Sequence, residues 1–209
     1  MSESPPLPNE LWERLRADPV RAPEHVALAA AEWHGPAAAA WADAKRARLA
    51  VSGADLARMA KRRHASLARA GGAATGVGGF LTVVPDIVLL AWIQSRLVFF
   101  TAAAYGFDPR DPMRPAELLV LRDLYPDPET ARRALDGIGK TVAEAYVGAK
   151  LERAREQAML SRLLRFAGKR AAVGATRRLI PGVAIAFNAI ANERETRELA
   201  DRAARFYGG

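Results

Sequence analysis

Cysteine is absent from this 209-residue chain, and histidine is scarce. Without cysteine the chain has no disulfide, no thiol nucleophile and no cysteine-bound zinc or iron–sulfur cluster. The three histidines, His25, His34 and His64, are not spaced to place two metal ligands on one helix face. No serine lies in a GxSxG motif, so an elbow-type hydrolase is unsupported. We therefore name no catalytic residue, no metal ligand and no cofactor from the sequence.

Alternating β-branched residues are also scarce, whereas alanine, leucine, arginine and glutamate dominate. This composition favours helix, and a chain of this length can bury about 70% of its unfolded surface in one core. We predict an all-α fold, a single-domain multi-helix bundle over residues 9–209 that follows a disordered tail at 1–8. Ser52 and Asp55 have the spacing of a capping box and predict a helix start. The expected helices cover 9–17 (capped by Asn9), 23–33 (ending at Gly35 and Pro36), 36–50, 52–70, 115–124, 128–148, 150–178 and 181–207.

A long apolar segment, residues 71–106, contains only two charged residues, Asp86 and Arg96, and is interrupted by Pro85. Proline is tolerated in a first helical turn, and a carboxylate there faces the positive end of the helix. We predict a hairpin of two helices, at 72–82 and 85–105. Gly106 provides its C-terminal stop. The longest uncharged run has 16 residues, whereas a spanning helix needs about 20, so a hairpin buried in the core and one that meets lipid both stay open.

Polar residues within or beside apolar stretches are the candidate functional or structural positions: Asp86, Arg96, Tyr105, Asp108 and Asn188. An ionisable residue in apolar surroundings is a site candidate. The structural alternative for Asp86 is helix capping, and for Arg96 it is an ion pair. An unpaired buried charge costs several kcal/mol, so Arg96 must reach solvent or a carboxylate from elsewhere in the fold.

Positive charge is concentrated in two blocks. The formal net charge is +8, yet residues 45–63 carry +6 and residues 150–178 carry +7, which leaves −5 for the rest of the chain. Such blocks favour an anionic partner. One face of the predicted helix at 150–178 carries the candidate contacts with an anionic surface: Arg155, Arg162, Arg165 and Lys169. A helix packed on a core with a solvated outer face has the same pattern.

Nucleic acid is not favoured as the partner, because the basic blocks have few aromatic residues for stacking and no reader motif is evident. The N-terminus has acid and proline where a signal peptide needs a basic start and an apolar run. We therefore expect a cytoplasmic protein, and a peripheral one at the inner face of the cell membrane if the basic helix binds lipid. The oligomeric state is not indicated.

Several elements, in their order and spacing, resemble the signature of the EcsC family. They are GAATGVGG at 72–79, Pro85, Asp86, Arg96 and AYGFD at 104–108, with Val173, Gly174, Pro181 and Asn188 in the closing motif. The resemblance covers roughly residues 40–207 of this sequence. It implies a bacterial protein, cytoplasmic or membrane-associated, with a membrane protein such as an ABC transporter as a candidate partner. It carries over no catalytic residue.

Three functions follow as hypotheses. The first is a peripheral membrane-associated helical protein, an accessory to a membrane transport system. The second is a soluble helical interaction or scaffold protein. The third is an uncharacterised hydrolase-like enzyme that works through Asp86, Arg96 and their neighbours.

Overall fold

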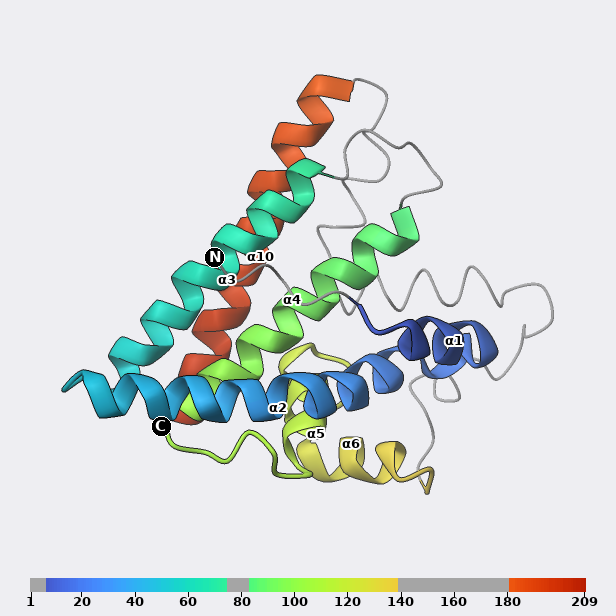
Figure 1. Cartoon of the computed structure of the whole chain (residues 1–209). Helices are drawn as coiled ribbons and strands as arrows, with labels where there is room; N and C mark the ends of the chain where they lie inside the picture. The colour runs from blue at the N-terminus through green and yellow to red at the C-terminus, as the bar shows by residue number, and fades with distance from the viewer. Residues whose placement is uncertain (1–6, 75–82, 139–180) are drawn as a thin grey trace.

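The computed structural model describes residues 7–74, 83–138 and 181–209 (Figure 1). Over these residues the chain forms helices and loops without a strand, which confirms the predicted all-α bundle. The elements are α1 (Asn9–Ala17), the 3-10 helix η1 (Pro19–Arg21), α2 (Ala22–Arg48), α3 (Gly53–Ala74), α4 (Val83–Ala104), α5 (Arg114–Leu121), α6 (Pro128–Leu135) and α10 (Pro181–Gly208).

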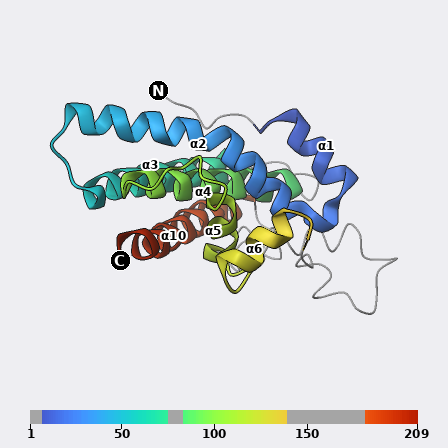
Figure 2. The same ribbon diagram turned by 90° about the horizontal axis from the view of Figure 1, so that it is seen from below.

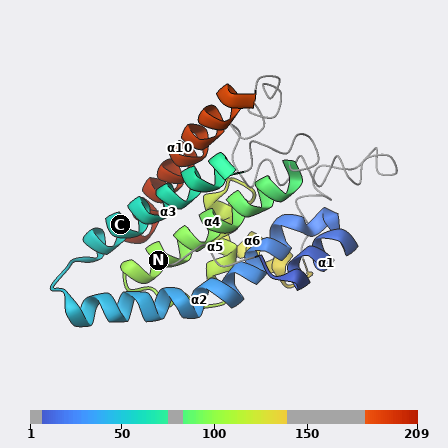
Figure 3. The same cartoon turned by 45° about the horizontal axis from the view of Figure 1, so that its top comes forward.

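Helix α4 lies at the centre of the bundle. It packs against α2, α3 and α10, while α3 and α10 run side by side along most of their described length (Figures 1 and 3). Figure 2 shows α2 on one side of α4 and α10 on the other. The short helices α5 and α6 contact each other and α2.

The side chains of α4 form much of the core. From Val88 to Ala104 all of them are buried except Leu89 and Arg96. The large side chains Trp92, Phe99 and Phe100 are at most 2% exposed, and full burial of such a side chain stabilises the fold by about 1.5–3 kcal/mol. Over this range, the second arm of the predicted hairpin is therefore a core helix.

Several predicted boundaries are confirmed. Helix α1 has the predicted limits, although Pro8 occupies the N-cap position and no side chain caps the helix, so the capping role expected of Asn9 is wrong. At the start of α3 the Asp55 N–H donates to Ser52 Oγ at 3.1 Å, and the Ser52 N–H donates to Asp55 Oδ2 at 3.2 Å. This is the predicted capping box.

The predicted break at Gly35 and Pro36 is wrong, because α2 continues through both residues. An internal proline removes one helical hydrogen bond and costs about 3 kcal/mol. Tertiary packing offsets this cost, since buried residues such as Ala30 and Ala38 lie on either side of the proline. Gly35 also lies against the loop after α4, where a Cβ atom would approach the Pro109 carbonyl oxygen to 2.9 Å.

Two further boundaries differ from the prediction. Helix α3 passes the expected break after residue 70 and runs to Ala74, so residues 72–74 are not a separate arm. Helix α6 ends at Leu135, not at 148, because Gly137 takes φ +76° and its N–H donates to the Ala134 carbonyl at 3.1 Å. The described residues do not include the turn of the predicted hairpin, the helix predicted at 150–178 or residues 1–6 of the tail predicted at 1–8. The last two residues of that predicted tail are ordered, since Leu7 packs against the core and Pro8 is buried.

None of the helices, within the ranges that the structure describes, combines the length and hydropathy needed to cross a bilayer.

Candidate functional site

The loop that follows α4 contains the AYGFD residues at 104–108. Helix α4 ends at Ala104, and Gly106 then takes φ +92°. The Gly106 N–H donates to the Ala103 carbonyl, and the Phe107 N–H donates to the Ala102 carbonyl, both at 3.1 Å. A left-handed glycine that closes the last turn in this way is a common helix C-cap, so the predicted stop at Gly106 is confirmed.

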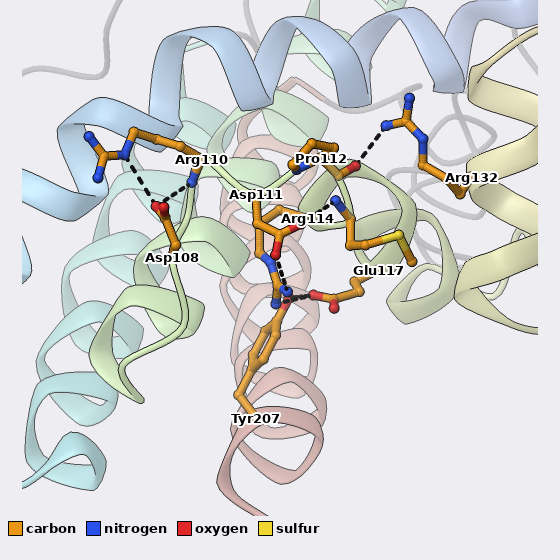
Figure 4. Close-up of polar contacts among 9 residues, drawn as sticks. Asp108, Arg110, Asp111, Pro112, Arg114, Glu117, Arg132 and Tyr207 are labelled. Atoms are coloured by element: carbon orange, nitrogen blue, oxygen red, sulfur yellow. Dashed lines mark hydrogen bonds and ion pairs between the residues drawn. The ribbon is translucent and has the colours of Figure 1, made fainter.

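A buried cluster of three polar side chains joins this loop to α5 and to the end of α10 (Figure 4). Arg114 Nη1 donates to Glu117 Oε2 at 2.5 Å, and the Tyr207 hydroxyl donates to the same oxygen at 2.7 Å. Arg114 Nη2 also lies 3.7 Å from Asp111 Oδ2. We call Arg114, Glu117 and Tyr207 the Glu117 cluster.

The electrostatics of the Glu117 cluster follow from its burial. Burial raises the pKa of the Glu117 carboxyl, while the hydrogen bond from Tyr207 and the charge of Arg114 oppose that shift. Burial, and then the neighbouring carboxylate, raise the pKa of the Tyr207 phenol well above its usual value. Tyr207 therefore stays a hydrogen-bond donor at neutral pH, and the cluster fastens α10 to α5.

Asp108 orders the loop. The backbone N–H and the Nε of Arg110 donate to Asp108 Oδ1 at 2.9 and 3.2 Å. These hydrogen bonds hold the pKa of the exposed Asp108 carboxyl below its usual value. Nearby, Arg132 Nη1 donates to the Pro112 carbonyl at 2.7 Å (Figure 4). The contacts of Asp108 are those of a residue that fixes loop conformation.

Tyr105 fills a space between the start of α3 and the end of α10. A Cβ atom on Gly53 would lie 2.8 Å from the Ala104 carbonyl oxygen and 3.3 Å from the Tyr105 ring. A Cβ atom on Gly208 would lie 3.1 Å from the same ring. Two glycines thus make room for this half-buried aromatic ring, which gives Tyr105 a packing role.

Arg96 lies nine residues before Tyr105 on α4, about 13 Å along the helix. Its guanidinium stacks over the Phe100 ring, with 5.0 Å from Cζ to the ring centroid. Burial and the charge of Arg63 lower its pKa. No carboxylate among the described residues pairs with Arg96, and the group is only partly exposed. Among the described residues, the contact of the Arg96 guanidinium is this stacking on an aromatic ring.

The other sequence candidates receive no side-chain description. Asp86 lies on α4 and Asn188 on α10, but only their backbone is described. The candidate surface contacts Arg155, Arg162, Arg165 and Lys169 lie outside the described residues. Of the five polar candidates, the structure brings Tyr105 and Asp108 together in one loop and places Arg96 elsewhere on α4.

A second buried network of side-chain hydrogen bonds was not predicted from the sequence. Gln94 Nε2 donates to Thr196 Oγ1 at 3.2 Å, and Arg122 donates to Gln94 Oε1. Burial lowers the pKa of the Arg122 guanidinium to about 9, while the Glu195 carboxylate opposes the shift. The network ties α4 to α10 and to the end of α5.

The missed residues differ in how visible they are in the sequence. Arg114 and Glu117 are three residues apart, a spacing at which side chains meet on a helix, so this half of the Glu117 cluster could have been found. Tyr207 is 90 residues from Glu117, and no local sequence pattern predicts that contact. Within the described ranges, no group of three or more metal-ligating side chains occurs.

Comparison with known proteins gives one family. The model of the EcsC protein family matches residues 20–208. No curated protein and no solved structure matches this chain.

Proposed function

This chain belongs to the EcsC protein family, and on that premise we propose that it is a peripheral membrane protein that binds an anionic lipid surface. The contact region is the connection between α2 and α3 together with the adjoining part of α3, as far as Arg62, about 14 Å along that helix. We call Lys45, Arg48, Leu49 and Arg62 the basic corner. Figure 2 places the connection between these helices at one extremity of the molecule, far from α1.

A surplus of cations that form no ion pair with a carboxylate of the described residues supports this proposal. Residues 45–63 contain seven Lys and Arg residues against one aspartate. Three of the seven are engaged: Arg46 donates to the Ala103 carbonyl at 2.7 Å, Arg58 pairs with Asp55, and Lys61 lies 2.6 Å from Asp201. The remaining four make no ion pair with a described residue: Lys45, Arg48, Arg62 and Arg63.

An exposed apolar residue accompanies these cations. Leu49 directly follows Arg48 in the connection after α2 and is 42% exposed. Each Lys or Arg near an anionic leaflet contributes about 1 kcal/mol to binding, and an apolar side chain beside them can enter the interface. The described part of the apolar α4 is core, so the basic corner, and not that helix, supports the proposal.

Vesicle flotation tests the proposal. We expect the protein to float with vesicles that contain phosphatidylglycerol and not with neutral phosphatidylcholine vesicles. Salt at 0.5 M should release it, because the Debye length then falls below about 8 Å. The double variant Arg48→Gln, Arg62→Gln should bind anionic vesicles roughly tenfold or more weakly, since two contributions of about 1 kcal/mol are lost.

A matched control uses Arg14→Gln with Arg16→Gln on α1, which removes the same charge from two exposed residues at the other end of the molecule. This control should keep the affinity of the unmodified chain. If the unmodified chain does not float with anionic vesicles at low salt, the proposal is wrong and a soluble interaction or scaffold role replaces it.

A further inference from the structure

Basic side chains from three helices meet inside the bundle. His34 of α2 and His64 of α3 are at most 1% exposed, and Arg96 of α4 is partly buried. The His34 ring lies 4.2 Å from Trp92, centroid to centroid, and the His64 ring lies 5.2 Å from Phe100. Because Arg96 also stacks on Phe100 at 5.0 Å, all three groups share one face of α4. We call His34, His64 and Arg96 the core basic cluster.

The charges that act on the core basic cluster are positive. Burial, Arg96 and His64 together lower the pKa of His34 to about 3. Burial lowers the pKa of His64 to about 3, against a hydrogen bond to Ala60 and with help from Arg96 and Arg63. Two carboxylates of α10, the helix that packs on α3 and α4, are engaged elsewhere: Asp201 with Lys61 and Glu193 with Arg69. Among the described residues, the cluster therefore has no counter-charge.

Several nitrogen atoms of this region are buried and have no hydrogen-bond partner among the residues that the structure describes. They are Nε2 of His34, Nε2 of His64, Nε1 of Trp92, and Nε and Nη1 of Arg96. Buried polar atoms almost always have partners. The Nδ1 atom of His64 lies 2.8 Å from the Ala60 carbonyl oxygen, so it carries the proton and leaves Nε2 as the open position. Five of the twelve buried polar atoms of this kind among the described residues lie along one face of α4, between Trp92 and Phe100. We infer that a group outside the described residues completes them.

We propose that the core basic cluster is a binding site for an oxyanion of the phosphate or sulfate class. The Arg96 and Trp92 N–H groups donate to its oxygens. Each histidine takes a proton from solvent as the anion enters, and then donates from Nε2. A metal ion does not fit, because the positive charges of Arg96 and Arg63 repel it. Arg96 and Arg63 are partly exposed, so the anion has a basic route from the surface.

Sulfate is the probe for the first test, since it remains a dianion between pH 5 and 8 and any pH dependence belongs to the protein. We expect sulfate, compared with chloride at equal ionic strength, to raise the thermal unfolding temperature and to bind more tightly at pH 5.5 than at pH 7.5. Arg96→Gln should weaken sulfate binding by about tenfold or more, because a charge-assisted hydrogen bond is lost. Arg16→Gln, which removes the same charge from an exposed residue of α1, should bind like the unmodified chain.

A second measurement needs no variant. The ¹⁵N resonances of Nε2 in His34 and His64 should move toward the protonated form when sulfate is titrated at pH 6. The proposal is overturned if sulfate acts no differently from chloride, if Arg16→Gln and Arg96→Gln bind sulfate alike, or if both resonances stay in place. Water alone would then occupy the open positions.

A phosphate group can be a free ion or part of a lipid headgroup, and parallel titrations separate these sources. Inorganic phosphate tests the free ion, and a water-soluble short-chain phosphatidic acid tests the headgroup. Binding of either supports the site, and binding of neither overturns it. Both titrations are done without vesicles, so their outcome is independent of the flotation result for the basic corner.

Discussion

Replacement of Tyr207 by phenylalanine removes one oxygen atom from the Glu117 cluster and leaves the ring in place. The hydroxyl donates to Glu117 Oε2 at 2.7 Å, and both residues are at most 8% exposed. A hydrogen bond to a charged group contributes about 1.5–3 kcal/mol. Glu117 keeps its bond from Arg114, so we expect a loss of about 2 kcal/mol. For a chain of this size that loss lowers the melting temperature by roughly 4–8 °C.

The loss should depend on pH. At pH 7.5 the Glu117 carboxylate is charged and the bond is strong. Burial raises the pKa of Glu117, so the folded chain binds this proton more readily than the unfolded chain. The carboxyl therefore stabilises the fold more as the pH falls from its folded-state pKa toward its unfolded-state pKa. The hydroxyl of Tyr207 opposes the shift, so Tyr207→Phe raises the pKa of Glu117 further. The difference between variant and parent should therefore shrink toward pH 4.

Urea denaturation at pH 7.5 and pH 4 measures both effects. Tyr105→Phe is the matched control, because its hydroxyl makes no hydrogen bond within the described residues and its ring packs at the same end of the molecule. We expect that control to change stability by less than about 0.5 kcal/mol. Equal losses in the two variants, or a loss for Tyr207→Phe that does not vary with pH, would refute the role assigned to the buried carboxylate.

Three other predictions concern stability. Ser52→Ala removes the side-chain cap of α3 and should cost about 1 kcal/mol in urea denaturation, whereas the exposed mid-helix Ser66→Ala should not. Gly53→Ala places a Cβ atom 2.8 Å from a backbone carbonyl oxygen and should lower the unfolding free energy by about 1–3 kcal/mol; an unchanged value would contradict the close packing at Gly53. Burial lowers the pKa of His34 and His64 to about 3, so their contribution is complete above their unfolded value of about 6.5 and is lost as the pH falls toward 3, at up to about 1.4 kcal/mol per pH unit for each. In chloride buffer, the unfolding free energy of His64→Gln should depend on pH about half as steeply over this range as that of the unmodified chain.

Local signals predicted the ends of several helices. The capping box at Ser52, the left-handed glycine at Gly106 and the final helix through Tyr207 all depend on neighbours within four residues, and the structure confirms each. The all-α class followed from composition for the same reason. Such features are readable because the physics that determines them acts within one helical turn.

Tertiary packing explains the wrong boundary at Pro36, and a glycine conformation explains the one after Leu135. Pro36 is a strong breaker in isolation, yet α2 packs against both α4 and α5 and stays helical through it. Conversely, residues 136–148 have helical composition, but Gly137 ends α6 after Leu135. Contacts from other helices overrode the local preference at Pro36, whereas the end of α6 depends on a local signal, a left-handed glycine of the same kind as Gly106.

The candidate site residues likewise divide into those that local sequence reveals and those that only tertiary contacts reveal. Tyr105 and Asp108 were singled out from the sequence, and the structure gives both of them roles in packing and loop conformation. The Tyr207 contact with Glu117 and the meeting of His34 with His64 join residues that are far apart in the chain. No spacing rule relates such residues, so only the fold could reveal them.

The basic block at 45–63 shows why net charge alone overstates a surface field. Three consecutive cations of α3 point in directions about 100° apart and reach three different environments. Lys61 pairs with Asp201 at 2.6 Å, Arg62 is exposed, and Arg63 is partly buried and its charge lowers the pKa of Arg96. One charge is thus neutralised within the fold, one faces solvent at the basic corner, and one adds to the uncompensated charge of the core. An anion in the core would relieve the repulsion between Arg63 and Arg96 without changing the charge that Arg62 presents outside, so the two proposed sites share a helix and remain separable.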